Sequence, residues 1–269
     1  MSIIEIEQTG RVRTLRLNRP EKMNALSEEL AWGIVHAVSD AQADQDTWVI
    51  AITGNGRGFC AGLDLTPAND DADVPHASGM GRQDLYLDEL HWVSRLCFTL
   101  REECDKPIVA GINGVAVGAG LSLAMGCDIR IMAEGARLMA GYPRIGGSPD
   151  GGLSWTLSQA VGYEQAMKFL LENRTVLGPE ALHMKLVGEV VPDAHLDSRL
   201  AEYCAQLASI SPITARLTKR VVRNATRHQD LEAHLRYELN NISRAFASED
   251  GREARAAFLE KRDPHFEGR

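Results

Sequence analysis

Hydrophobic and polar positions at the beginning of the chain indicate strands and a helix in alternation. Three short runs rich in aliphatic and β-branched residues, 3–8, 12–18 and 48–53, predict strands. Thr9-Gly10 separates the first two runs and is typical of a hairpin. Between the second and third runs, apolar residues recur at the helical period behind Ser27, which predicts a helix with Ser27 as its N-cap. This order of elements is typical of an α/β domain.

The alternation continues to about residue 133 and then gives way to helices. The pattern predicts a helix over 83–103, a buried strand over 108–112, and a short helix followed by a strand over 121–133. We therefore predict an α/β core, 1–195, followed by a C-terminal helical region, 196–269. The helical periods after the strands cover 153–160, 163–172, 179–185, 196–208 and 213–247.

Composition and charge narrow the class of protein. The chain has 269 residues, of which 44% are hydrophobic and 25% charged, and these are ordinary values for a globular protein. Its net charge of −8 argues against a protein that coats nucleic acid, because phosphate backbones favour clustered lysine and arginine. No stretch reaches the roughly 18 apolar residues of a membrane span, and residues 1–8 lack the pattern of a signal peptide. We expect a cytoplasmic protein with no nucleic-acid or membrane partner.

The five cysteines are odd in number and include no CxxC pair, which favours reduced thiols over a disulfide framework or a zinc site. Cys60 lies in a glycine-rich turn, where a nucleophile is one interpretation. No histidine is near it in the sequence, so packing is the favoured one. The histidines of the last third lack metal-ligand spacing, and we predict no metal site.

Two glycine-rich turns, 53–65 and 113–121, each follow a predicted strand. Small residues let a backbone approach a ligand closely and leave its N–H groups free to donate. The second turn also opens a helix, where unsatisfied N–H groups and the helix dipole favour negative charge. Neither turn matches a dinucleotide-binding or P-loop fingerprint, so each by itself indicates only a turn. Together they suggest an oxyanion hole.

Asp150 is a carboxylate among glycines and prolines, in Ser148-Pro-Asp-Gly-Gly152. One interpretation is a turn residue or a helix N-cap, because Pro-Asp-Gly is a common turn sequence. The other interpretation is a catalytic acid–base group. One carboxylate is enough to move a proton, whereas adding water across a double bond requires two.

Four stretches of the chain resemble the crotonase family, also called the enoyl-CoA hydratase/isomerase family. They run from Leu17 to Leu26, Ile52 to Leu65, Lys106 to Gly120 and Glu249 to Arg262, so the likeness covers nearly the whole chain. The resemblance implies an α/β fold, a spiral of ββα repeats with a C-terminal helical region used in trimer formation. It also implies a coenzyme A thioester as substrate, whose carbonyl oxygen is held by two backbone N–H groups, and no metal or redox cofactor.

Carried over position by position, the two N–H groups belong to Leu63 and Ala119. The resemblance places the two catalytic glutamates of the hydratases at Ser122 and Tyr142, so neither acid is present here. Asp150 falls where other branches carry a catalytic aspartate, namely ring-epoxide isomerases of phenylacetyl-CoA breakdown, dienoyl-CoA isomerases and aryl-CoA dehalogenases. The first of these branches has the most similar motif, and a catalytic Asp150 becomes the favoured interpretation.

The resemblance also implies residues that bind the rest of the substrate. Lys22 stands where the family often places a cation for the nucleotide phosphates, and Phe258 with Lys261 stand where a neighbouring subunit often contributes. For both lysines, a plain surface charge is the alternative. The remaining positions expected along the substrate path or in its pocket are Ala25, Ala61, Asp64, Gly118, Ser122 and Tyr142.

The loop 67–81 and the helix that follows it are expected to shape the acyl pocket. The predicted function is an acyl-CoA isomerase that moves a double bond or rearranges an unsaturated or ring acyl-CoA, assembled as a homotrimer or a dimer of trimers. The alternatives are an enoyl-CoA hydratase, a hydrolase or dehalogenase that uses Asp150, and a non-catalytic acyl-CoA-binding paralogue. Pocket candidates whose roles the sequence leaves open are His76, Arg82, Tyr86 and His91.

Overall fold

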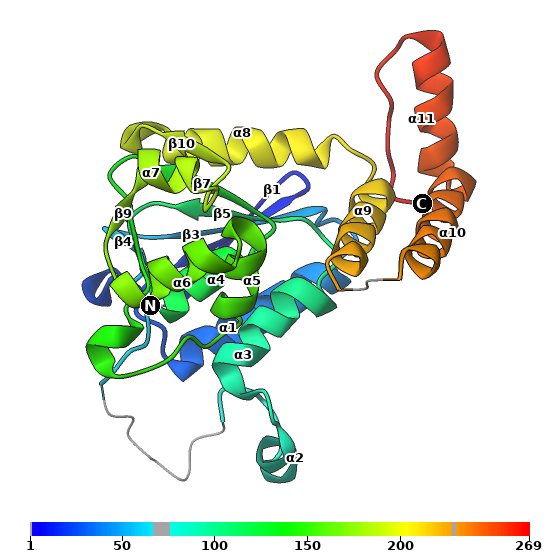
Figure 1. The fold of residues 1–269 in the computed structure, drawn as a ribbon. Coiled ribbons are helices and arrows are strands. Elements are labelled where there is room, and N and C mark those ends of the chain that lie inside the picture. Colours follow the sequence, from blue (N-terminus) through cyan, green and yellow to red (C-terminus); the bar gives the residue numbers. More distant parts are fainter. Residues whose placement is uncertain (1, 67–75, 228–229) are drawn as a thin grey trace.

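The computed structural model describes residues 2–66, 76–227 and 230–269, and its fold is shown in Figure 1. The helix predicted behind Ser27 begins as expected, because the Ser27 hydroxyl accepts a hydrogen bond from Leu30 N–H at 3.2 Å. The predicted hairpin is also present, with Thr9 opposite Val12 in antiparallel register. The first elements are β1 (Ile4–Thr9), β2 (Val12–Leu17), α1 (Glu28–Ala43) and β3 (Val49–Gly54).

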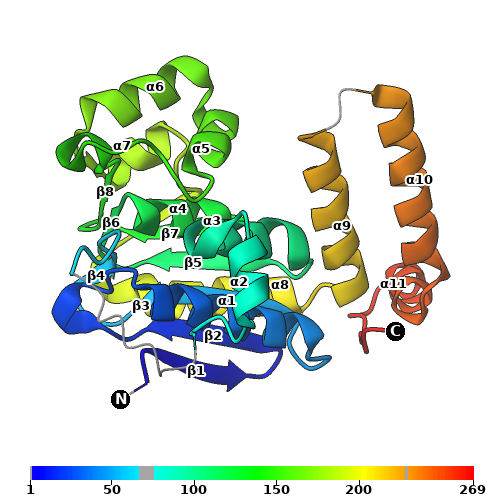
Figure 2. The same ribbon diagram turned by 90° about the horizontal axis from the view of Figure 1, so that it is seen from below.

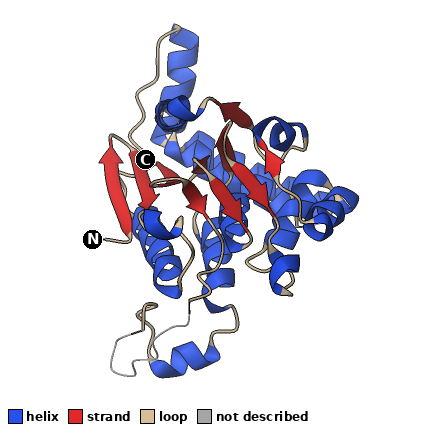
Figure 3. Ribbon diagram, turned by 90° about the vertical axis from the view of Figure 1, so that its left-hand side faces the viewer, coloured by secondary structure: helices blue, strands red, loops and turns tan. Residues whose placement is uncertain are grey.

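The strands form two sheets. The larger has the order β1-β2-β3-β5-β7-β10, and from β2 onwards all its neighbours are parallel. The smaller has the order β4-β6-β8-β9, with the pairs β4/β6 and β6/β8 parallel. Figure 3 shows the strands fanned across the centre of the molecule. The further strands are β4 (Gly58–Cys60), β5 (Ile108–Ile112), β6 (Val115–Val117), β7 (Ile129–Ala133), β8 (Arg137–Met139), β9 (Val176–Leu177) and β10 (Glu189–Val191).

The chain alternates between the two sheets. β3, β5 and β7 of the larger sheet are followed after a short turn by β4, β6 and β8 of the smaller sheet, respectively. Each strand pair of this kind therefore lies parallel to the next one. This arrangement confirms the predicted spiral of an α/β fold. β3 and β5 are buried along their whole length, as expected for parallel strands that are covered on both faces.

Helices cover both faces of the larger sheet (Figure 1). α8 packs on one face, where it contacts β2, β3, β5 and β7 and buries Leu196, Leu200 and Cys204. α1 lies on the other face and contacts β1, β2 and α3. The further helices of this part are α3 (His91–Phe98), α4 (Ala119–Gly126), α5 (Leu153–Val161), α6 (Tyr163–Glu172), α7 (Gly178–His183) and α8 (Leu196–Ala208), with 3-10 turns at Pro20–Lys22, Tyr142–Ile145 and Asp193–His195.

The single helix predicted over 83–103 is broken in the structure. α2 (Arg82–Leu87) ends at Asp88, and a π-helical turn, Thr99–Glu103, extends α3. The side chain of Asp88 accepts hydrogen bonds from Leu90 N–H and from Arg95, and it thereby competes with the helical pattern. The segment 83–103 contains neither glycine nor proline, so the sequence pattern had no strong break signal there.

The last three helices project from the core as an arm, which Figure 2 shows beside the sheets. The predicted helical pattern 213–247 is divided between two of them, and Asp230 caps the second by accepting a hydrogen bond from Ala233 N–H at 3.0 Å. α8 lies after the predicted boundary at residue 195 but packs on the larger sheet. The helices that leave the core therefore begin after α8. The arm comprises α9 (Pro212–Ala225), α10 (Leu231–Ala247) and α11 (Glu249–Glu260).

Candidate active site

The two glycine-rich turns lie side by side because the strands before them are parallel neighbours. β4 pairs with β6 so that Gly58 is opposite Val115, and both strands therefore end at the same edge of the smaller sheet. The turns also touch through their backbones. A Cβ atom on Gly62 would stand 2.8 Å from the Val117 carbonyl oxygen, and one on Gly120 would stand 2.0 Å from the Cys60 carbonyl oxygen. Glycine at these positions allows the close approach.

Leu63 and Ala119 each present a backbone N–H beside this contact. Leu26 donates to Gly62 C=O at 2.7 Å and accepts from Asp64 N–H at 3.0 Å. Because the residues on either side of Leu63 make these bonds, the Leu63 N–H points to the opposite side.

Ala119 is the first residue of α4, where an N–H has no intrahelical acceptor. Within the described part of the chain, neither this N–H nor that of Leu63 has an acceptor. Both residues line one cavity of about 100 Å³. The residues that line it are Ala61, Gly62, Leu63, Leu65, Val117, Gly118, Ala119, Gly141, Tyr142 and Ile145.

Asp150 is joined to this cavity by hydrogen bonds. Tyr142, which lines the cavity, donates through its hydroxyl to Asp150 Oδ1 at 2.8 Å. Ser122, one turn into α4 from Ala119, has its hydroxyl 3.2 Å from Tyr142 Oη and donates to the Asp150 carbonyl oxygen at 3.1 Å. The three residues named from the sequence as Ser122, Tyr142 and Asp150 therefore form one connected group beside the free N–H groups.

The side chain of Asp150 does not cap the helix that follows it. The N-cap position of α5 is Gly152, without a side-chain hydrogen bond, while the Asp150 carbonyl accepts from Leu153 N–H at 3.0 Å. Gly151 and Gly152 have φ values of +56° and +77°. A Cβ atom on Gly152 would stand 2.5 Å from Cys97 Sγ. The two glycines thus serve the turn and its packing on α3, while the carboxylate is directed to Tyr142.

Burial controls the protonation of two side chains here. Tyr142 is 5% exposed, and burial together with the adjacent Asp150 charge raises the pKa of its phenol well above the usual range. Tyr142 therefore keeps its proton and acts as the donor to Asp150. Burial raises the pKa of the Cys60 thiol to about 12, so Cys60 is a neutral packed side chain rather than a nucleophile.

A group of charged residues surrounds Asp64, near the end of the first turn, at the rim of the cavity. Asp64 Oδ2 pairs with Lys22 Nζ at 3.1 Å and with the Arg19 guanidinium at 2.6 Å. A hydrogen bond from Thr66, together with those from Arg19 and Lys22, holds the pKa of Asp64 far below its usual range. Two cations against one carboxylate leave the rim positive. Arg19 also donates to the Ala25 carbonyl, which brings Ala25 into the same group.

Sequence reasoning missed Arg19. The residue lies within the stretch from Leu17 to Leu26 that carries the family resemblance, next to a proline. Its ion pair is with Asp64, which is distant in the sequence, so no local pattern indicates the contact.

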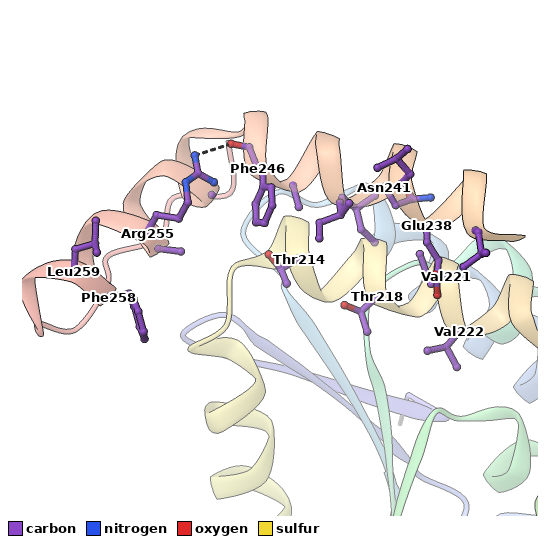
Figure 4. Close-up of a pocket in the computed structure, with 17 residues that line it drawn as sticks. Thr214, Thr218, Val221, Val222, Glu238, Asn241, Phe246, Arg255, Phe258 and Leu259 are labelled. Carbon is purple, nitrogen blue, oxygen red and sulfur yellow. Dashed lines mark hydrogen bonds between the residues drawn. The ribbon is translucent and has the colours of Figure 1, made fainter.

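Phe258 and Lys261 do not meet this site within the chain. Phe258 lies on α11 with 83% of its surface exposed, and Lys261 follows as the C-cap of that helix. Phe258 lines a separate apolar groove of about 990 Å³ between α9, α10 and α11, shown in Figure 4. Its walls include Leu239, Ile242 and Phe246. This groove therefore lies in the arm, away from the free N–H groups.

Three of the candidates for the acyl pocket, His76, Tyr86 and His91, do not line the small cavity either. His76 is bound to Glu28 at 2.9 Å and to the Ser78 hydroxyl at 2.8 Å. Tyr86 is 91% exposed on α2, and His91 is exposed at the start of α3. Most of the predicted loop, 67–75, lies outside the described residues, as does the side chain of Arg82.

Two general properties of the described residues bear on function. Nowhere in the described ranges do three or more histidine, cysteine, aspartate or glutamate side chains gather in a way that would hold a metal ion. None of the described helices combines the length and hydropathy that are needed to cross a membrane.

Comparison with known proteins places these features in a family. The sequence model of the "Enoyl-CoA hydratase/isomerase" family matches residues 7–269. The chain is 32% identical over 259 residues to the 1,2-epoxyphenylacetyl-CoA isomerase of Escherichia coli (strain K12), covering 96% of this chain and 95% of that protein. It is 34% identical over 266 residues to the "Probable enoyl-CoA hydratase" of Rhodobacter capsulatus, covering 99% and 98%.

A solved structure agrees with these sequence similarities. The crystal structure of an enoyl-CoA hydratase from Bacillus anthracis matches with a TM-score of 0.86 at 30% identity, covering 100% of both chains. The two-sheet spiral, the paired glycine turns and the full-length similarities together show that this chain belongs to the enoyl-CoA hydratase/isomerase family, the crotonases.

Proposed function

We propose that the protein is an acyl-CoA isomerase that moves a double bond by proton transfer through a single carboxylate. The observation that carries this proposal is the hydrogen-bonded connection of Asp150, through Tyr142, to the cavity lined by Leu63 and Ala119. The similarity to a relative named as an isomerase supports the same reaction class.

In the proposed reaction, the thioester oxygen accepts hydrogen bonds from Leu63 N–H and Ala119 N–H. Asp150 removes a proton from a carbon conjugated to the thioester, so that a C–H bond breaks, an O–H bond forms and a dienolate is left. The negative charge of the dienolate oxygen is stabilised by the two N–H groups, of which one is typically worth about 3 to 4 kcal/mol. The carboxylic acid then returns the proton to a different carbon, and no oxidant or co-reactant is consumed.

Hydration of an enoyl-CoA is the alternative, because the relative named as a probable enoyl-CoA hydratase is 34% identical to this chain. A hydratase holds a water molecule between two acids. Here Ser122 and Tyr142 occupy those positions with hydroxyl groups, and they bind each other and Asp150. This arrangement favours proton transfer over addition of water.

The rest of the substrate is proposed to extend over the rim of the cavity. Lys22 has 41% of its side chain exposed beside Leu63 and Asp64, and with Arg19 it offers positive charge to the phosphates of coenzyme A. We further propose a homotrimer, or a dimer of trimers, in which Phe258 and Lys261 of a neighbouring copy approach this rim. The exposed apolar side chains of the arm, shown in part in Figure 4, support association.

The test is Asp150→Asn, assayed with 3-enoyl-CoA substrates. Asparagine keeps the shape and the acceptor for Tyr142 but cannot carry the proton, so kcat should fall by about 10²- to 10⁴-fold. Asp40→Asn, at an exposed position on α1, is the matched control. Undiminished double-bond migration in Asp150→Asn would exclude the proposed role.

Two measurements separate the remaining functions. Product analysis in ¹⁸O-labelled water identifies hydration or hydrolysis, since either reaction incorporates solvent oxygen and isomerisation does not. Calorimetry with a panel of acyl-CoA thioesters, compared with turnover of the same compounds, identifies a protein that binds without catalysis.

A further inference from the structure

We propose that Tyr142 is a positioning residue that holds Oδ1 of Asp150 and leaves Oδ2 as the one atom that takes and returns the proton. This inference rests on the function proposed above. Tyr142 donates to Oδ1 at 2.8 Å, and among the described residues no hydrogen bond is made to Oδ2.

The backbone of Asp150 is already fixed from several sides. Its carbonyl oxygen accepts hydrogen bonds from the Ser122 hydroxyl at 3.1 Å and from Leu153 N–H at 3.0 Å. A Cβ atom on Gly151 would stand 2.8 Å from Val93, and one on Gly152 would stand 2.5 Å from Cys97. The turn therefore packs closely against α3. The freedom that remains is rotation of the carboxylate about its own side-chain bonds, and this is the freedom that Tyr142 removes.

The hydrogens available on Tyr142 and Ser122 determine which group donates each hydrogen bond. An ionised carboxylate can only accept, so the hydrogen between Tyr142 and Asp150 comes from the tyrosine. The Ser122 hydroxyl has a single hydrogen, which the Gly118 carbonyl at 3.2 Å, the Asp150 carbonyl and Tyr142 Oη all compete to accept. Ser122 therefore supports Tyr142 and the turn, but it does not hold the carboxylate itself.

Tyr142 is suited to hold its proton throughout the reaction. Its side chain is buried, and its neighbour is an anion before the proton is taken and a neutral acid afterwards. Because Tyr142 already occupies Oδ1, the proton from the substrate enters on Oδ2, and it leaves from the same atom. Removal and return through one oxygen should occur on one face of the substrate.

The experiment uses the full-length protein with a stereospecifically deuterated 3-enoyl-CoA. In the wild type, deuterium should be removed from and returned to the same face. Transfer to the opposite face would exclude return of the proton by Asp150, and it would overturn both the single-oxygen assignment and the single-carboxylate reaction. Same-face transfer combined with unchanged Tyr142→Phe would overturn the single-oxygen assignment alone. An active Asp150→Asn would instead overturn the proposed function.

Tyr142→Phe removes the hydroxyl and keeps the ring. We expect kcat to fall about 10- to 100-fold, which corresponds to one hydrogen bond to a charged group. KM should stay within about twofold. The fraction of deuterium retained in the product should fall relative to the wild type, because a freely rotating carboxylic acid exchanges its proton with solvent.

Tyr163→Phe is the matched control, because it makes the same substitution at a tyrosine of α6 that is 77% exposed and outside the site. Its kcat and deuterium retention should remain close to the wild type. The proposal is overturned if Tyr142→Phe keeps the kcat and the deuterium retention of the wild type, or if Tyr163→Phe changes both as much as Tyr142→Phe does. Opposite-face transfer in the wild type would overturn the assignment even if Tyr142→Phe fails to fold.

Discussion

Gly120 in α4 lies directly against the backbone carbonyl of Cys60 at the end of β4, where a Cβ atom would stand 2.0 Å from the carbonyl oxygen. Any side chain at this position would force the helix and the strand apart. Leu63 lies shortly after Cys60 in the first glycine-rich turn, and Ala119 directly precedes Gly120. Together with the contact of Gly62 against Val117, this contact sets the spacing of the two candidate oxyanion donors.

Replacement of Gly120 by alanine should lower kcat strongly, although the added methyl group is small. In an unhindered helix, alanine is more favourable than glycine by about 0.8 to 1 kcal/mol. Here the added methyl group must displace the turn, and the loss of one aligned N–H donor should lower kcat by about 10²- to 10³-fold. Steady-state kinetics and urea unfolding of Gly120→Ala would measure both effects.

Gly188→Ala is the control for this prediction. A Cβ atom on Gly188 would meet the Arg130 carbonyl oxygen at 3.7 Å, which is ordinary contact. It should therefore leave kcat unchanged. If Gly120→Ala behaved in the same way, the contact with Cys60 would not set the donor spacing.

Replacement of Lys22 by alanine should weaken substrate binding and leave the chemical step intact. Lys22 lies at the rim, bound to Asp64, and it is not among the residues that line the cavity. We expect a rise in KM of about 3- to 10-fold for coenzyme A thioesters with little change in kcat, because the interaction is the same in the ground state and the transition state. The difference should shrink in high salt, since exposed charges are screened.

The comparison is with Lys168→Ala, which removes an exposed lysine from α6. That variant should show wild-type KM at all salt concentrations. A truncated thioester that lacks the nucleotide phosphates should bind wild type and Lys22→Ala equally well. A salt-independent loss of kcat in Lys22→Ala would contradict the role assigned to the rim.

Several ion pairs join the arm to the core, and Asp105 takes part in two of them. Asp105 is 6% exposed, with Arg220 Nε 2.8 Å from its Oδ2 and Arg223 3.2 Å from its Oδ1. Lys219 Nζ also bonds Asp128 at 2.8 Å and the Leu100 carbonyl at 3.1 Å. Asp105→Asn should lower the free energy of unfolding by about 1.5 to 3 kcal/mol.

The effect of Asp105→Asn should depend on pH in a defined direction. Burial raises the pKa of Asp105, but the hydrogen bond from Arg220 and the charges of Arg220 and Arg223 outweigh burial, so the pKa is lowered overall. A carboxyl group with a lower pKa in the folded chain stabilises the fold above its unfolded pKa of about 4 and loses that contribution as the pH falls. The advantage of the wild type should be full near pH 7 and should shrink below about pH 4.

Urea unfolding of both proteins across this pH range measures the difference. Asp46→Asn removes a carboxylate that is 81% exposed and paired with Arg11. That surface pair should be worth less than about 1 kcal/mol at any pH. A constant difference between the wild type and Asp105→Asn from pH 7 to pH 3 would show that the charge of Asp105 does not dock the arm.

The helices and strands that the sequence predicted well are those specified by neighbours in the chain. α1 begins where Ser27 satisfies a free N–H, and α6 occupies the predicted residues 163–172, because caps and apolar periods act over a few residues. The break at Asp88 was missed because it depends on a side-chain contact with Arg95 rather than on a glycine or proline.

The candidate site shows the same division. The sequence by itself determined the family, the two glycine turns and the position of Asp150, since these are readable as residue types at fixed places. Only the tertiary structure decided that Gly120 touches Cys60, that Arg19 shares Asp64 with Lys22, and that Tyr142 holds one oxygen of Asp150. Such pairs depend on which strands are parallel neighbours and on how closely two backbones can approach, and neither property is encoded in the local pattern of the chain.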